Sequence, residues 1–127
     1  SRNITYAISK DNSENLLIGK NRGLGKFDPN TGSYEDIGKP LSDLPVHLLL
    51  NHGEFLIAGT YRGVYKINTS SRKISPIFST VENGERNYIY SIRESKDKSV
   101  WIASTKGLLK IDKQLSKVTL VKFQEQK

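Results

Sequence analysis

Hydrophobic and polar residues alternate with a period of two in several short runs along this chain. The clearest example lies near the C-terminus, where "YIYSIRE" (88–94) alternates. Short polar turns separate it from the short apolar run "VWIAS" (100–104) and from "LLKID" (108–112) and "VTLVKF" (118–123). Runs of this length and period indicate β-strands, whereas an amphipathic helix needs a period of 3.6 over ten or more residues. We find no such helical stretch, so the pattern predicts an all-β chain.

The same pattern occurs three times. The stretches "LLIGKNRGLGKFD", "LIAGTYRGVYKIN" and "VWIASTKGLLKID" align without a gap on Gly23, Gly63 and Gly107, which are 40 and then 44 residues apart. Each repeat divides into four strands, and the second repeat has a shortened first hairpin at "NHGE" (51–54). Four antiparallel strands per unit of about 40 to 45 residues are typical of β-propeller blades.

We therefore predict a single partial β-propeller domain over residues 1–127. It consists of three four-stranded antiparallel blades at about 4–37, 46–77 and 88–123, with linkers near 38–45 and 78–87. The second strand of each blade is apolar on consecutive residues, as expected for a strand covered on both faces by neighbouring blades. Trp101 lies on such a strand, and we interpret it as an inter-blade core residue, with a sugar-stacking platform as the alternative.

Short polar residues recur where the third strand of each repeat ends. Asp28, Asn68 and Asp112 occupy equivalent positions. Their side chains can accept a hydrogen bond from their own backbone two residues further on, which starts a turn. We therefore predict a structural rather than a catalytic role for them.

The segment "IYSIRESKDKSVWIASTKGLLKID" closely resembles the two-component regulator propeller repeat, and "LLIGKNRGLGKFDPNTGSYEDI" and "LIAGTYRGVYKIN" are weaker copies of it. Such repeats typically build the extracytoplasmic sensor region of hybrid two-component histidine kinases, notably in gut Bacteroidetes, where they sense breakdown products of complex glycans. The resemblance implies a non-catalytic sensor segment in the periplasm, within an inner-membrane protein. The chain begins with Ser and contains no Met, so we expect it to be a piece of a longer protein.

Positive charges recur at fixed places in the repeats. Arg22, Arg62 and Lys106 stand just before the repeat glycine, and Lys26, Lys66 and Lys110 stand three residues after it. In a four-stranded antiparallel blade, the turn between strands two and three lies at the same end as the linker to the next blade. We therefore expect one basic end that also includes Lys20, Lys39 and Arg86. A solvated surface without a ligand is the alternative interpretation.

The candidate ligand-binding residues are Arg22, Tyr61, Arg62 and Lys106, with Tyr61 as a stacking partner. The net charge of +7 favours an anionic ligand. Aromatic residues are not interleaved with the basic ones as a nucleic-acid platform requires, which argues against nucleic acid. An anionic glycan or a partner protein suits the family resemblance better, and the resemblance makes an acidic oligosaccharide the expected ligand. An interaction scaffold that mediates dimerisation is the alternative function. A lyase similar to the streptogramin-type propeller enzymes, which use histidine catalysis, is a third.

Other chemistry finds little support. The chain has no Cys, which excludes disulfides and zinc-thiolate sites, and no apolar run long enough to span a membrane. We predict neither a metal site nor a cofactor. His47 and His52 have no equivalents in the other repeats, so we interpret them as surface or turn residues.

Three blades cannot close a propeller, which usually has four to eight. Two apolar faces should therefore stay open, and we expect further blades of the parent chain or a second copy to cover them. The residues expected on the first face are Ile4, Tyr6, Leu16, Ile18, Leu24 and Phe27. Those expected on the last face are Ile92, Trp101, Ile102, Leu108 and Ile111.

Overall fold

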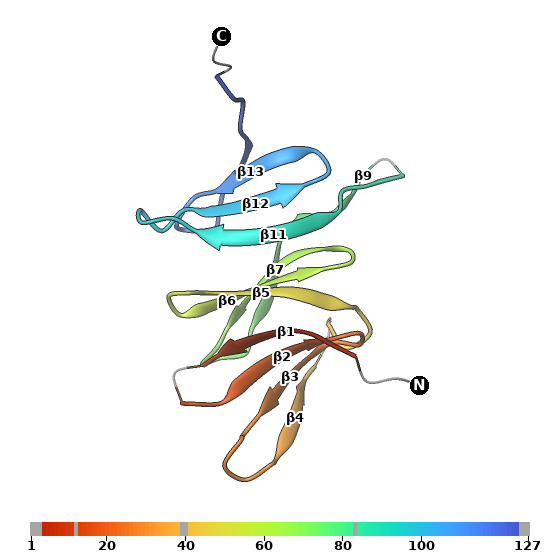
Figure 1. The fold of residues 1–127 in the computed structure, drawn as a ribbon, viewed down its shortest axis with the longest axis vertical. Coiled ribbons are helices and arrows are strands. Elements are labelled where there is room, and N and C mark those ends of the chain that lie inside the picture. The colour runs from red at the N-terminus through yellow and green to blue at the C-terminus, as the bar shows by residue number, and fades with distance from the viewer. Residues whose placement is uncertain (1–3, 12, 39–40, 83, 125–127) are drawn as a thin grey trace.

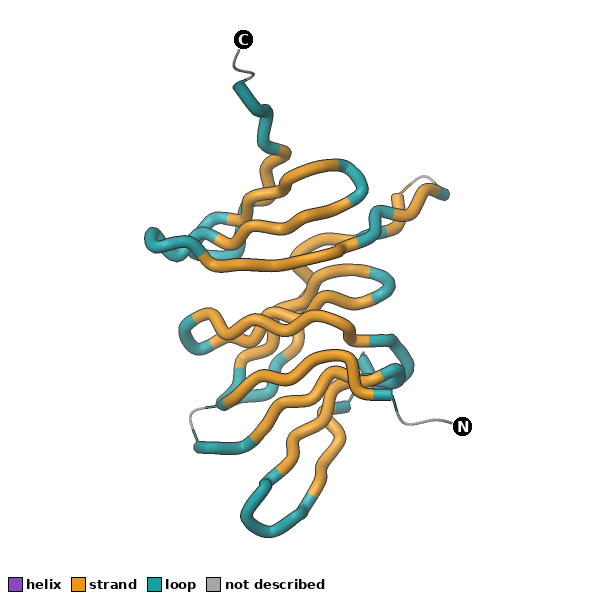
Figure 2. Tube along the Cα trace, viewed as in Figure 1, coloured by secondary structure: helices purple, strands orange, loops and turns teal. Residues whose placement is uncertain are grey.

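The computed structural model describes residues 4–11, 13–38, 41–82 and 84–124. Across these ranges the chain forms strands joined by turns and loops, and none of the residues lies in a helix (Figure 2). Consequently, the described ranges hold no helix that is long and apolar enough to cross a membrane.

Twelve of the strands form three sheets of four. The first sheet holds β1 (Thr5–Lys10), β2 (Leu16–Lys20), β3 (Leu24–Phe27) and β4 (Tyr34–Ile37). The second holds β5 (Val46–His52), β6 (Phe55–Thr60), β7 (Gly63–Asn68) and β8 (Ile74–Ser79), and the third holds β11 (Ile89–Glu94), β12 (Val100–Ser104), β13 (Gly107–Ile111) and β14 (Val118–Leu120). Strand order follows the chain in each sheet, and all pairs are antiparallel. The prediction of three four-stranded antiparallel blades is confirmed.

A short hairpin lies in the linker between the second and third blades. It pairs β9 (Val81–Glu82) with β10 (Glu85–Arg86) and projects beside the turn between β12 and β13 (Figure 1). Two residues per strand are too few to show a period in the sequence, so the pattern of apolar residues did not predict this hairpin.

The first strands of the three blades run side by side. In Figure 1, β5 lies between β1 and β11, and the remaining strands of each sheet extend away from this row. Each first strand carries a β-bulge at an equivalent place, at Tyr6, His47 and Tyr90. The simple alternation expected for these strands is therefore interrupted once in every blade.

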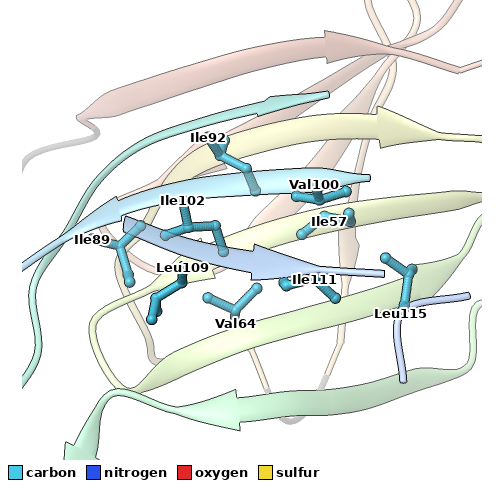
Figure 3. Close-up of a cluster of buried hydrophobic side chains, with 9 residues drawn as sticks. All are labelled: Ile57, Val64, Ile89, Ile92, Val100, Ile102, Leu109, Ile111 and Leu115. Atoms are coloured by element: carbon cyan, nitrogen blue, oxygen red, sulfur yellow. The ribbon is translucent and has the colours of Figure 1, made fainter. Parts of the chain in front are cut away.

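Apolar side chains fill the two interfaces between blades. Leu17 and Leu24 of the first blade are buried with Leu56, Ala58 and Ile67 of the second. Successive side chains of a strand point to opposite faces, so Ile57 of the same β6 packs toward the third blade instead. There it joins a cluster of buried side chains that Figure 3 shows: Val64, Ile89, Ile92, Val100, Ile102, Leu109, Ile111 and Leu115. The predicted burial of the second strand on both faces is confirmed for β6.

Four residues expected on the open faces are buried instead. Leu24 packs on the second blade from one side, and Ile92, Ile102 and Ile111 pack on it from the other. The prediction was wrong here because it did not separate the two faces of each strand, and a step of one residue changes the face.

Strand register identifies the residues that do face outward. Leu17 and Ile57 are buried against the following blade, and Trp101 is their equivalent in the third blade, where it is half-buried on the outer face. At the other end, Ile8 is 65% exposed, and the half-buried Ile18 lies opposite it. The open faces therefore exist, with this corrected set of residues.

Candidate ligand-binding rim

The turns between the second and third strands of all three blades lie along one side of the molecule, on the right in Figure 1, which is the same end of each blade. In each blade, the residue after the second strand donates its backbone N–H to the carbonyl of the residue that enters the first strand. The three bonds are Asn21 to Ile4 at 3.0 Å, Tyr61 to Pro45 at 3.2 Å and Thr105 to Tyr88 at 3.0 Å. These bonds tie turn and linker together at the same end, as the strand order predicts.

Arg22, Arg62 and Lys106 follow directly in these turns, and all three are exposed. We call this set the basic rim. The structure therefore places these three side chains in equivalent turns of successive blades, although they are 40 and 44 residues apart in the sequence. Like charges gathered on one surface raise the local concentration of anions around it.

The charge of Lys20 is partly neutralised by its neighbours. Its Nζ lies 3.4 Å from Asp36 Oδ1 and 4.5 Å from the centre of the Tyr34 ring. The contact with the Tyr34 hydroxyl, and then that with the Asp36 carboxylate, raise the pKa of Lys20. Lys20 thus belongs to a network of the first blade. Lys39, the other lysine expected at this end, lies outside the described residues.

Tyr61 is the aromatic residue of the candidate site, and its ring is partly occupied. The guanidinium carbon of Arg86 lies 3.5 Å from the centre of the Tyr61 ring, and Arg86 also donates a hydrogen bond to the Tyr61 carbonyl. The guanidinium carbon of Arg86 also lies 5.9 Å from the centre of the Tyr88 ring. The fold thus places the guanidinium of Arg86 on the ring of Tyr61, although the two residues are 25 apart in the sequence.

Tyr61 nevertheless remains available to a ligand, because it is 46% exposed. Tyr88 is exposed to a similar degree, at 49%. The sequence argument singled out Tyr61 from its place in a turn. It missed Tyr88. A search of the linkers for aromatic residues close to basic ones, such as Tyr88 beside Arg86, would have found it.

The recurring Lys26, Lys66 and Lys110 do not join the basic rim. Lys26 and Lys66 lie opposite Leu17 and Ile57 in the strand ladder, and Lys110 lies opposite Trp101 on the outer face. Each of the three has a local partner. Lys26 Nζ is 3.6 Å from Asp11 Oδ2, while Lys66 and Lys110 each lie 5.3 Å from the centre of an aromatic ring, that of Phe55 and that of Trp101. These lysines support the blades.

The two histidines connect the second and third blades, so their interpretation as surface or turn residues is wrong. His52 is only 7% exposed; its Nδ1 lies 2.7 Å from Glu94 Oε2 and its Nε2 lies 2.7 Å from the Lys113 carbonyl. His47 Nε2 lies 3.2 Å from the Ile89 carbonyl. The partners are 42 to 61 residues away in sequence, which is why local patterns did not reveal them.

The described residues hold no group of three or more His, Asp or Glu side chains that could bind a metal ion. The repeat-equivalent Asp28, Asn68 and Asp112 each accept the backbone N–H two or more residues further on, at 2.7 to 3.0 Å. Their predicted role in turns is confirmed.

The architecture is that of consecutive β-propeller blades, and comparison with solved structures finds the same arrangement in extracellular domains. One is the extracellular domain of BT4673 from B. thetaiotaomicron, described as a hybrid two-component system in one determination and as a one-component system in another; it shares 19% identity with this chain at a TM-score of 0.78. Another is that of BT3049 from the same organism, described as a hybrid two-component system, with 22% identity and a TM-score of 0.71.

These matches cover 94% to 96% of this chain but only 16% of each solved chain. The chain therefore has the fold of a small part of such extracellular domains. No family model matches the sequence, and no curated protein matches it either.

Proposed function

We propose that this chain is a non-catalytic, ligand-sensing propeller segment of a hybrid two-component sensor kinase, located on the periplasmic side of the inner membrane. The observation that carries the proposal is the match of 94% of the chain, at a TM-score of 0.78, to an extracellular domain of a two-component system. The repeat pattern of the sequence supports it independently, because it resembles the propeller repeats of such sensors.

The ligand in this proposal is an acidic oligosaccharide derived from a glycan, and it binds on the basic rim. Arg22, Arg62 and Lys106 supply the charge, and the exposed Tyr61 offers an aromatic surface. An exposed ion pair contributes about 0 to 1 kcal/mol, so the affinity has to come from several cations acting together. Because these cations come from three blades, a bound oligosaccharide also joins the blades to one another.

An interaction scaffold is the second candidate, and the open faces of the end blades favour it. Ile8, Leu16, Ile18 and Phe27 lie on the outer side of the first blade with no blade against them. Further blades of a parent chain or a second copy of this chain could cover that face.

A titration separates the two functions. The chain is titrated with oligogalacturonate and with a neutral oligosaccharide of similar length, and heat of binding and molecular mass are followed. Saturable binding of the acidic oligomer supports the sensor. Firm self-association without binding of either sugar supports the scaffold instead.

A further inference from the structure

A hollow of about 220 Å³ lies on the second blade, where β6 begins, β7 ends and β8 begins. These strand ends are the ones furthest from the basic rim. The residues that line the hollow are Phe55, Lys66, Asn68, Ser71, Lys73 and Ser75. Each polar side chain among them can donate a hydrogen bond, two carry a positive charge, and none is acidic. This composition favours an anion.

The two lysines of the hollow have no carboxylate partner. Lys66 Nζ lies 5.3 Å from the centre of the Phe55 ring, which is neutral. Among the described residues, no carboxylate oxygen lies within 4.0 Å of Nζ of Lys66 or of Lys73. Like charges that line one space repel each other, and an anion between them replaces this repulsion with attraction.

The turn between β7 and β8 fixes which polar atoms can donate. Asn68 Oδ1 accepts the backbone N–H groups of Ser70 and Ser71, both at 3.0 Å, which identifies it as the oxygen and leaves Nδ2 as the donor of this side chain. Ser71 Oγ accepts the Lys73 N–H at 3.3 Å, so its own hydroxyl hydrogen is not used in that bond. Ser75 adds a second hydroxyl from β8, opposite Lys66 in the strand ladder.

The third blade has a related hollow with a different charge balance. Lys110 and Lys117 line a space of about 420 Å³ there, but the carboxylates of Asp97 and Asp112 line it as well. The backbone N–H of Asp112 donates to the Lys117 carbonyl at 3.1 Å, as that of Asn68 does to the second lysine of its own blade at 2.9 Å. Asp112 and Asn68 are thus equivalent, and an amide in place of a carboxylate keeps the hollow of the second blade positive.

In the first blade, the equivalent lysine is already paired. Lys26 Nζ lies 3.6 Å from Asp11 Oδ2, and Ser33 stands where the second blade has Lys73. Among the described lining residues of the three blades, only those of the second therefore combine two lysines with no carboxylate.

We propose that the hollow of the second blade binds a tetrahedral oxoanion, that is, a sulfate or phosphate group. Lys66 and Lys73 supply the charge, while Asn68 Nδ2 and the hydroxyls of Ser71 and Ser75 donate hydrogen bonds to its oxygens. Charge-assisted hydrogen bonds of this kind are about twice as strong as neutral ones. The volume lies below the range of about 300 to 1,000 Å³ for drug-sized ligands, which suits one small group. This site is separate from the basic rim and does not depend on the proposed function.

The test titrates ¹⁵N-labelled full chain with sodium sulfate and with sodium phosphate, against sodium chloride at equal ionic strength, and follows the backbone amide signals by NMR. In the wild type, we expect saturable shifts at Ser71, Lys73 and Ser75 with the oxoanions and not with chloride. D-glucose 6-phosphate forms a further arm: tighter binding than inorganic phosphate assigns the group to a larger ligand, and equal or weaker binding assigns it to the free ion.

Asn68→Asp is the decisive variant. A carboxylate at this place can still accept the N–H groups of the turn, as Asp112 accepts those of Ser116 at 2.7 Å and Lys117 at 3.0 Å. It also puts a negative charge into the hollow, so we expect at least a tenfold loss of affinity. Asn51→Asp makes the same change on an exposed residue of β5 that does not line the hollow, and it should bind like the wild type.

A second variant removes the positive charge without adding a negative one. Lys66→Gln combined with Lys73→Gln should show no saturable binding. If Asn68→Asp binds as tightly as Asn51→Asp, or if the double lysine variant still binds, the hollow is not the site. The same conclusion follows if the oxoanions shift the signals of Arg22 and Arg62 but not those of Ser71, or if chloride causes the same shifts.

Discussion

Asp97 holds the turn between β11 and β12 through two hydrogen bonds to one carboxylate oxygen. The Ser95 hydroxyl donates to Oδ1 at 2.6 Å, and the Ser99 N–H donates to the same atom at 3.0 Å. These bonds favour the ionised carboxylate, the first more than the second, and lower the pKa of Asp97 from 3.8 to about 2. The same turn positions Ser95, whose Oγ also accepts the Trp101 Nε1–H at 2.8 Å.

The lowered pKa predicts how this turn responds to acid. Because the folded pKa lies below the unfolded one, Asp97 contributes stability that is fully present above about pH 4 and is lost as the pH falls toward 2. We expect the stability of the wild type to decrease more steeply than that of Asp97→Asn over this range. Chemical unfolding at a series of pH values measures the difference, and equal slopes for the two proteins contradict the assignment.

His52 yields a second prediction for a single residue. Both of its ring nitrogens face acceptors, a carboxylate and a carbonyl, and they join the second blade to the third. We expect His52→Ala to lower the free energy of unfolding by about 1 to 3 kcal/mol, because the buried contacts of the ring with the Glu94 carboxylate and the Lys113 carbonyl are lost. Asn51→Ala, on the exposed preceding residue, is the control. Denaturant titration gives both values, and a His52→Ala protein as stable as its control would rule out a structural role.

At the scale of elements, close contact between blades restricts residues at strand ends. A Cβ atom at Gly19 of β2 would lie 2.4 Å from the carbonyl oxygen of Val46, which is a backbone atom of the next blade. At Gly38, in contrast, no heavy atom lies within 4 Å of the corresponding position. The two glycines therefore differ in the space around them.

This difference predicts opposite results for the same substitution. We expect Gly19→Ala to destabilise the fold by about 1 to 3 kcal/mol, since the second blade must shift to make room. Gly38→Ala should leave stability nearly unchanged. Thermal unfolding of both variants measures the effect, and equal melting temperatures would show that the blades do not pack as closely as described.

The apolar runs and the period-two pattern were sufficient to predict the strands of all three blades, because successive side chains of a strand point to opposite faces. It could not predict the β-bulges at Tyr6, His47 and Tyr90 or the hairpin of β9 and β10, since these depend on single residues and on two-residue strands. The last strand also ends earlier than expected, at Leu120 rather than at Phe123. Beyond Leu120, one more backbone hydrogen bond joins the Val121 N–H to the Leu108 carbonyl.

At the scale of the whole molecule, the position of the basic rim followed from strand order alone, because antiparallel connectivity places equivalent turns at one end. The stacking of Arg86 on Tyr61 and the buried amide of Asn87 could not be predicted in this way. Both depend on how the linker between the second and third blades folds back on its neighbours. The candidate site was thus predictable in location but not in contacts.

The open face of the first blade predicts association. Ile8 is 65% exposed, but its equivalent in the third blade, Ile92, is 4% exposed because the preceding blade covers it. We expect the wild type to form a homodimer or a larger assembly at micromolar concentration, and Ile8→Lys to shift it toward the 14.3 kDa monomer. Tyr90→Lys, at a side chain of equal exposure, is the control.

Sedimentation velocity distinguishes the possibilities. A wild type that sediments as a monomer at all concentrations contradicts the prediction, and so does an Ile8→Lys protein that associates as strongly as Tyr90→Lys.

The central claim is that several rim cations act together on an acidic oligosaccharide. Calorimetric titration of oligogalacturonate into the wild type and into the triple variant Arg22→Ala, Arg62→Ala, Lys106→Ala tests it most directly, at low ionic strength and at about 0.15 M. We expect the wild type to bind more weakly at the higher ionic strength, because salt screens exposed charges, and the triple variant to show no saturable binding under either condition. Binding that is independent of salt, or that survives the triple substitution, would contradict the account.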